Sequence, residues 1–244
     1  MFEEIDQLKN HLDKLRPLDP RLVKNQLNDL ILRWTYHSNA IEGNTLTLLE
    51  TKVILENGIT IGGKTLREHF EAINHREAIL YLLDIIQKNE PFSEWLIRSI
   101  HQLILKNIDD EQAGRYRTIN VTISGASHIP PDHTSLIDKM TQFIDWYHSN
   151  ARTLHPIERA AKIHAEFVGI HPFSDGNGRT SRLLMNLELM KAGYLPCILT
   201  VENRLDYYQA LDDWMTKKET KTFVQIIADA ELDALKQYQR LLGF

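Results

Sequence analysis

The residues most able to do chemistry lie in one stretch, IHPFSDGNGRTSR, at positions 170–182. Gly176 and Gly178 lack a Cβ, so backbone N–H groups there can approach a ligand closely. Arg179 and Arg182 lie three residues apart, hence on one face of the helix that should follow, and guanidinium groups suit phosphate oxygens. The first turn of that helix adds unpaired N–H groups and a positive dipole end. The stretch therefore predicts a cradle for a di- or triphosphate.

Three more side chains of this stretch extend the prediction. Asn177 adds amide donors to the cradle, and Asp175 is a hard oxygen ligand beside it, in a place that suits a magnesium ion. His171 titrates near neutral pH and precedes the aspartate by four residues, so it can act as a general base. The alternative is a Gly/Asn turn with a solvated arginine face, which accounts poorly for this combination of residue types.

The composition excludes several classes of protein. The chain has 244 residues, a net charge of −5, 43% hydrophobic and 25% charged residues, which is typical of a globular protein and not of a disordered one. The acidic balance argues against nucleic acid as a partner. The single cysteine, Cys197, excludes an internal disulfide and fits a reducing compartment. Without a signal-peptide pattern or a run of about 18 apolar residues, we expect a cytoplasmic protein with no membrane partner.

The periodicity of apolar residues predicts an all-α fold in one domain, residues 1–244. Helices are expected near residues 5–15, 22–41, 47–56, 64–88, 93–106, 135–149, 154–170, 178–192, 203–215 and 220–241. The segment 117–132 departs from this pattern, because Val121 and Ile123 alternate with a threonine, Gly125 marks a bend and two prolines follow. It is expected to form a small β-hairpin or extended flap.

The stretch from His171 to Arg182 resembles the signature of the Fic family, HxFx(D/E)GNGRxxR, and every position is filled. The resemblance extends over roughly residues 25–240 and includes the HIPP end of the flap. It implies a Fic-like helical bundle, with N-terminal helices at 1–60, a target-binding flap at 117–132 and a catalytic core at 150–192. The edge of the flap at Val121 and Ile123 is then expected to pair with an extended segment of the target, with Ile123 clamping the target side chain. It also implies an enzyme that moves AMP from ATP to a Ser, Thr or Tyr hydroxyl of a target protein, or of itself.

The resemblance assigns roles to the residues of the motif. It implies that His171 deprotonates the hydroxyl that attacks the α-phosphate, and that Asp175 holds Mg²⁺, or Mn²⁺ in its place. The backbone at 176–178 would form an anion hole, while Arg179 and Arg182 would bind the β- and γ-phosphates. Neither the target protein nor the formation of a homodimer is indicated by the sequence.

Tyr207 and Tyr208 follow the core, and the resemblance suggests that one or both border the nucleotide base. Ordinary aromatic packing on an amphipathic helix is the alternative. The stretch 214–217, WMTK, differs from the family's pattern after these tyrosines, so the sequence does not indicate base specificity.

A second motif precedes the core. Ser38 to Asn44, SNAIEGN, resembles the family's inhibitory motif, (S/T)xxxE(G/N). Ser38 and Glu42 are one turn apart at a helix C-terminus, where the dipole disfavours a carboxylate unless a cation is near. Arg182 is the candidate, and a Glu42–Arg182 pair would remove the arginine expected at the γ-phosphate. The resemblance thus implies autoinhibition within the chain.

Other functions are also compatible with parts of the sequence. The same site could remove AMP from a modified protein, with Glu42 positioning a water. The segment 58–65, GITIGGKT, matches the P-loop pattern and would make Lys64 part of an ATPase, although no strand is indicated before it. A non-enzymatic regulator is the remaining alternative.

Overall fold

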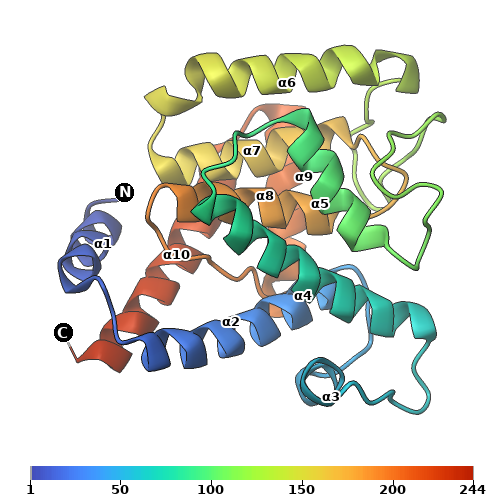
Figure 1. Ribbon diagram of the computed structural model, residues 1–244. Helices are drawn as coiled ribbons and strands as arrows, with labels where there is room; N and C mark the ends of the chain where they lie inside the picture. The colour runs from blue at the N-terminus through green and yellow to red at the C-terminus, as the bar shows by residue number, and fades with distance from the viewer. Residues whose placement is uncertain (1, 244) are drawn as a thin grey trace.

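The computed structural model describes residues 2–243, in which ten α-helices and three short 3₁₀ turns are present and no strand is formed. Figure 1 shows their arrangement. The helices are α1 (Glu3–Leu15), α2 (Pro20–Ile41), α3 (Leu48–Asn57), α4 (Leu66–Gln87), α5 (Glu94–Leu105), α6 (Leu136–Asn150), α7 (Pro156–Ile170), α8 (Asn177–Lys191), α9 (Arg204–Lys217) and α10 (Lys221–Leu242). The predicted all-α fold is confirmed, and each predicted helix is present with its ends displaced by two residues or fewer.

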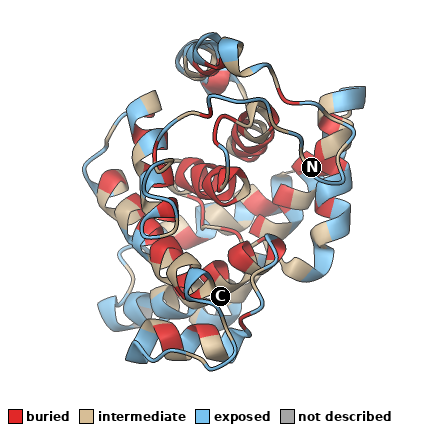
Figure 2. Ribbon diagram, turned by 90° about the vertical axis from the view of Figure 1, so that its right-hand side faces the viewer, coloured by how far each residue is buried: buried red, intermediate tan, exposed pale blue. Residues whose placement is uncertain are grey.

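The helix α8 lies at the centre, packed along its length against α7 and flanked by α4 and α5. Figure 2 shows the buried residues concentrated in these inner helices. One apolar cluster joins α8 to α1, α9 and α10 through residues such as Met185 and Phe223, and another joins it to α4, α5 and α6 through residues such as Leu183 and Ile97. Packing on both sides fixes the position of α8, and its first turn is the helix start predicted for the phosphate cradle.

Local sequence signals set the ends of the helices that lead to this centre. Asp19 accepts a hydrogen bond from the Arg21 N–H, and Pro20 occupies the first turn of α2, which is a favourable start for a helix. At the other end, Gly43 has a φ of 96°, a conformation that residues with a Cβ rarely adopt. The motif at residues 38–44 therefore lies at the C-terminus of a well-defined helix.

The segment 58–65 is a connection between helices. Gly58 ends α3 in the left-handed conformation, and Thr65 caps α4. The Lys64 ammonium donates to the carbonyl and the hydroxyl of Thr45, at 2.6 and 3.0 Å. Since a P-loop needs a buried strand before it and a lysine free to reach phosphates, this geometry does not favour the ATPase alternative.

The flap is an extended loop, so the predicted β-hairpin is not formed within the described part of the chain. Its two arms are not joined by ladder hydrogen bonds, partly because Pro130 and Pro131 supply no N–H donors. Side chains of the protein body hold the flap instead. Asp212 of α9 accepts hydrogen bonds from the N–H groups of Ser127 and His128, at 2.8 and 2.9 Å.

Arg117 fixes the base of the flap. Its buried guanidinium donates to the carbonyls of Ile119, Pro131 and His171, at 2.8, 2.6 and 2.9 Å. These hydrogen bonds tie both arms of the flap to the backbone of His171, the proposed general base. Residues 121–125 lie between the anchors, where Val121 and Ile123 are half-buried and the residues beside them are exposed.

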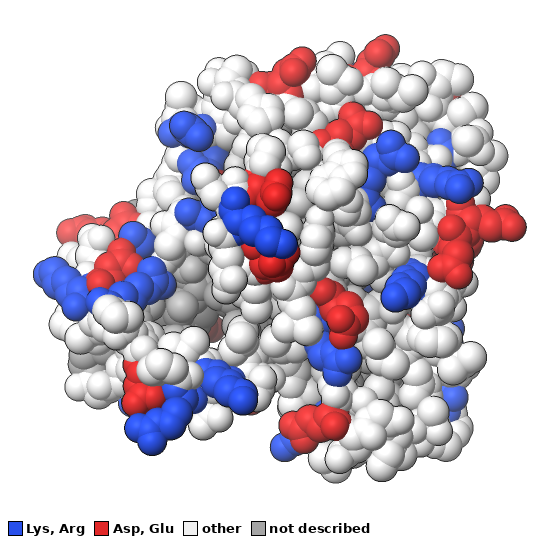
Figure 3. Space-filling model, viewed as in Figure 1, with Lys and Arg blue, Asp and Glu red and all other residues white. Residues whose placement is uncertain are grey.

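The surface and the helix compositions add two further facts. Figure 3 shows acidic and basic side chains interspersed over the face in view, without a large patch of one sign. Within residues 2–243, no helix has the length and apolar character needed to cross a bilayer.

We predict that Arg117→Met loosens the flap and leaves the core intact, because three carbonyls lose their donor. Amide exchange over residues 118–129 should rise by about tenfold or more, which corresponds to about 1.4 kcal/mol of local opening. Exchange in α8 should not change. Arg115→Met, which alters an exposed arginine two residues away, is the matched control, and equal exchange in both variants would contradict the anchoring role.

Candidate active site

The loop between α7 and α8 places His171 in an uncommon backbone conformation, with φ and ψ of 50° and 57°. Its Nδ1 lies 3.2 Å from the Val168 carbonyl. Because a carbonyl can only accept, Nδ1 carries a hydrogen, and in the neutral form of the ring the unprotonated nitrogen is Nε2. Burial lowers the pKa of His171, and the Arg117 charge adds to this, against the opposing effects of the Val168 carbonyl and Glu42. The ring is thus a neutral base at pH 7.

The first turn of α8 lies where the sequence predicts the cradle. Gly176 has a φ of 75°, and a Cβ there would lie 3.2 to 3.3 Å from the side chains of Ile104 and His101, so this position requires glycine. As in any helix, the first N–H groups of α8 have no partner in the preceding turn. They are the backbone donors expected for an anion hole.

The side chain of Asn177 has a role beyond the one predicted. Its Oδ1 accepts from the Phe173 N–H at 3.0 Å, and its Nδ2 donates to the Phe173 carbonyl at 2.8 Å. The amide is buried and braces the loop, so one of its two N–H donors is already used within the protein. The sequence could not distinguish these roles, because both need an amide at the same turn.

Glu42 lies against the cradle. A Cβ added at Gly178 would come within 2.2 Å of the Glu42 Oε1, so the missing side chain at that position makes room for the carboxylate. The start of a helix favours an anion. In this conformation, therefore, the carboxylate of Glu42 takes up space beside the first turn of α8 that a phosphate group would need.

Arg182 is almost completely buried, with a relative exposure of 2%, and α2 supplies most of its partners. Its Nη2 donates to Glu42 Oε1 at 2.7 Å and to the Ser38 carbonyl at 2.8 Å, and its Nε donates to the Ser38 hydroxyl at 3.0 Å. Burial disfavours the charge, but Glu42 and Tyr207 compensate for it and raise the pKa of Arg182. The structure thus brings together Ser38, Glu42 and Arg182, as the motif implied.

The two tyrosines are placed differently. Tyr207 is 3% exposed, and its hydroxyl accepts from Arg182 Nη1 at 3.3 Å and lies 3.0 Å from His164 Nε2. It supports Arg182 from inside the protein and has no face open to a nucleotide base. Tyr208 is 42% exposed and donates to the Ile41 carbonyl at 2.9 Å. Of the two, only Tyr208 has a ring that a ligand can reach.

Asp175 and Arg179 form an ion-pair cluster with two residues of α4. Arg179 Nη2 donates to Asp175 Oδ1 at 3.2 Å, and its Nη1 lies 3.2 Å from Glu71 Oε1. Arg67 pairs with both Asp175 and Glu71. Burial raises the pKa of Asp175, but Arg179, the Gly176 N–H and Arg67 outweigh this effect and lower it. The sequence analysis missed Arg67 and Glu71, which lie about a hundred residues before the motif and carry no signature of their own.

The residues present fit a magnesium ion bound largely through a nucleotide. Asp175 is an acidic side chain of the loop that leads into the cradle, and it is 44% exposed. The described residues contain no group of three or more His, Cys, Asp or Glu side chains that could hold a metal. One carboxylate with substrate phosphates and waters is a usual environment for Mg²⁺, unlike a cage of protein ligands.

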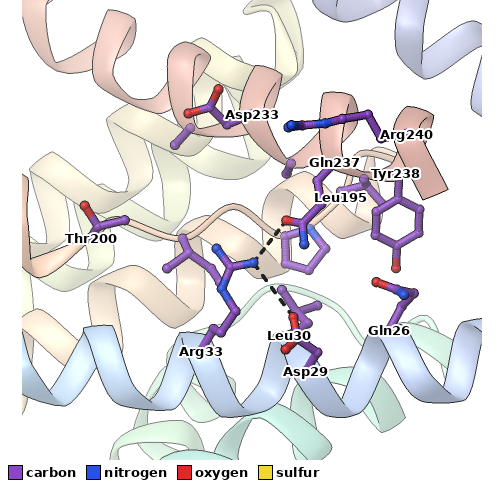
Figure 4. Close-up of a pocket in the computed structure, with 14 residues that line it drawn as sticks. Gln26, Asp29, Leu30, Arg33, Leu195, Thr200, Asp233, Gln237, Tyr238 and Arg240 are labelled. Carbon is purple, nitrogen blue, oxygen red and sulfur yellow. Dashed lines mark hydrogen bonds and ion pairs between the residues drawn. The ribbon is translucent and has the colours of Figure 1, made fainter. Parts of the chain in front are cut away.

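Cavities elsewhere in the protein do not involve the motif. One of about 340 Å³ lies between α2 and α10, where Arg33 donates to Gln237 at 3.0 Å (Figure 4). Another of about 530 Å³ lies beside the C-terminal end of α8. None of the residues 170–182 lines either cavity.

Comparisons with known proteins agree with this geometry. Residues 91–189 match the Fic/DOC family. The chain is 39% identical over 230 residues to protein adenylyltransferase Fic of Nematostella vectensis, covering 93% of this chain and 53% of that protein. It is 34% identical to protein adenylyltransferase fic-1 of Caenorhabditis elegans, covering 98% of this chain and 46% of that protein. The chain thus spans about half the length of these curated relatives.

Solved structures show the same relationship. The structure of Fic-1 (residues 134–508) from C. elegans aligns with a TM-score of 0.88 at 32% identity, covering 99% of this chain and 72% of that one. A Fic domain containing signaling protein from Bacteroides thetaiotaomicron aligns with a TM-score of 0.87 at 30% identity, covering 96% and 95%. With a complete motif, a matching fold and relatives of this similarity, the chain belongs to the Fic/DOC family.

Proposed function

We propose that this protein transfers AMP from ATP to a Ser, Thr or Tyr hydroxyl of a target protein. The observation that carries the proposal is the placement of His171, whose Nδ1 faces the Val168 carbonyl and leaves Nε2 as the proton acceptor, on the same short loop that leads into the first turn of α8. A proton acceptor and an anion cradle are thus held together on one rigid support. The names of the relatives, protein adenylyltransferase Fic and fic-1, support the same activity.

His171 acts as the general base. Its Nε2 accepts the hydroxyl proton while the hydroxyl oxygen forms a bond to the α-phosphorus of ATP, and the bond from that phosphorus to the bridging oxygen of the β-phosphate breaks, releasing pyrophosphate. The N–H groups in the first turn of α8, together with Arg179, bind phosphate oxygens whose charge grows during the reaction. Asp175 would hold Mg²⁺, which when bound would supply further neutralisation of that charge.

Glu42 restrains this reaction. Its carboxylate engages Arg182 at 2.7 Å and lies against Gly178, so the arginine proposed for the γ-phosphate is occupied. Because its γ-phosphate cannot bind Arg182, an ATP molecule cannot align its α-phosphate with an incoming hydroxyl. Removal of AMP with Glu42 positioning a water stays a prediction, and no contact in this conformation favours it over transfer.

The flap docks the target protein. Residues 121–124 are free of ladder partners within the described chain and alternate between half-buried Val121 and Ile123 and exposed neighbours. An extended segment of the target pairs with this edge through main-chain hydrogen bonds. Ile123 then packs against the side chain that receives AMP, on the same loop that Arg117 ties to His171.

We predict that His171→Ala, made in a Glu42→Gly background to relieve the restraint, slows AMP transfer by about 10²-fold or more, the usual scale of general-base catalysis. The measurement is incorporation of label from α-labelled ATP into lysate proteins or the protein itself. ATP affinity, measured by calorimetry, should stay within about twofold because the cradle is intact. Near-equal transfer rates with and without His171 would exclude it from the mechanism.

The pH dependence of the same assay follows from the pKa of His171. Because that pKa is lowered, the base form persists below the ordinary histidine value of about 6.5. The acid limb of kcat/KM, which reports the free enzyme, should therefore lie below pH 6.5. A limb at or above that pH would assign the titrating group elsewhere.

We predict that Ile123→Asp lowers transfer to protein targets by about tenfold, equivalent to about 1.4 kcal/mol, without changing ATP affinity. A charged side chain there disfavours packing against the target. Thr122→Asp adds the same charge at the exposed neighbouring position and should have a smaller effect. Equal losses in the two variants would point to charge repulsion and not to a clamp, and unchanged transfer would place target docking elsewhere.

A further inference from the structure

The two oxygens of Asp175 have different surroundings. Oδ1 accepts from the Gly176 N–H at 2.5 Å and from Arg179 Nη2 at 3.2 Å, both within the catalytic motif. Oδ2 accepts from Arg67 Nη2, which reaches it from the first turn of α4. The guanidinium of Arg67 therefore occupies the oxygen that remains for a metal ion.

The contacts of Arg67 permit its guanidinium to move away from Asp175. Its side chain is 54% exposed and that of Asp175 is 44% exposed, so neither is enclosed. The Nε of Arg67 donates to Glu71 Oε1 at 3.2 Å, which gives the guanidinium a second anchor. Glu71 is itself fixed, since it also pairs with Arg179 and accepts from Asn44 Nδ2 at 2.9 Å.

We propose that Arg67 is a further positioning residue of the nucleotide site, a stand-in cation that neutralises Asp175 until a metal-bound nucleotide displaces it onto Glu71. The proposal rests on the proposed function, because it assumes that Asp175 holds the metal of a nucleotide. Arg67 then determines how strongly nucleotide binding depends on the metal.

The proposal predicts that removing the Arg67 guanidinium changes the binding affinity in opposite directions for metal-free ATP and for Mg·ATP. Metal-free ATP meets an Asp175 whose charge Arg67 compensates, so removing the guanidinium exposes the phosphates to an unpaired carboxylate. Mg·ATP must displace Arg67 from that carboxylate, so removing the guanidinium eliminates a competitor. A residue that merely supported the fold of α4 would change both affinities in the same direction.

The test measures the ATP dissociation constant by calorimetry with excess EDTA and with excess Mg²⁺. Arg67→Gln should weaken metal-free binding and tighten Mg²⁺-dependent binding, each by about two- to fivefold, the range for a partly exposed ion pair. Arg67→Lys keeps the charge and should give a ratio of the two constants near that of the unaltered protein. Arg76→Gln removes a charge from the same helix, where the side chain pairs with Glu77, and should leave the ratio unchanged.

The outcomes separate this proposal from the proposed function. The role of Arg67 alone is overturned if the unaltered protein binds ATP more tightly with Mg²⁺ and Arg67→Gln leaves the ratio of the two dissociation constants unchanged. It is overturned equally if Arg67→Gln shifts both affinities in the same direction. An unaltered protein that binds no ATP under either condition overturns both. Melting temperatures of the variants, compared with the unaltered protein, exclude unfolding as the cause of any loss.

Discussion

The buried guanidinium of Arg182 is the constraint on which the site depends. A charge removed from water is very costly unless hydrogen-bonding partners surround it, and Arg182 finds them in the C-terminal turn of α2 and in Tyr207. Burial, with a smaller contribution from Arg182, lowers the pKa of His164 well below its ordinary value, so the ring beside Tyr207 is neutral. The requirement to satisfy one arginine therefore ties α2, α7, α8 and α9 together.

The same constraint underlies the proposed restraint by Glu42. Glu42 partners Arg182 at the start of α8, where a phosphate would be equally favourable, so under the proposed function a nucleotide must exchange with a carboxylate already in place. The neighbouring cluster follows the same principle, since Arg179 and Arg67 are also engaged by carboxylates. In this conformation the arginines of the site are thus paired with carboxylates, and under the proposed function nucleotide binding is an exchange of partners.

Sequence reasoning succeeded where the signal is local. Helical periodicity, the glycines of the motif and the turn between Ser38 and Glu42 are encoded by neighbouring residues. The Glu42–Arg182 pair, 140 residues apart, was predicted through the resemblance to the family's inhibitory motif, and the structure brings the two together. Sequence reasoning failed where a distant partner belongs to no such motif. Tertiary packing determines the burial of Tyr207, the loop-bracing role of the Asn177 amide and the contacts of the anchors Arg117 and Arg67. Side-chain anchors of this kind, and not a β-hairpin, hold the flap.

The central claim is that Glu42 withholds Arg182 from the γ-phosphate, and the most direct measurement is the ratio of the ADP and ATP dissociation constants in Mg²⁺. If Arg182 is withheld, the unaltered protein binds the two nucleotides within about twofold of each other. Glu42→Gly should then favour ATP by about tenfold, as expected for a hydrogen bond to a charged group worth about 1.5 kcal/mol or more. Adding Arg182→Ala should abolish that preference. A ratio that is the same before and after Glu42→Gly would contradict the account.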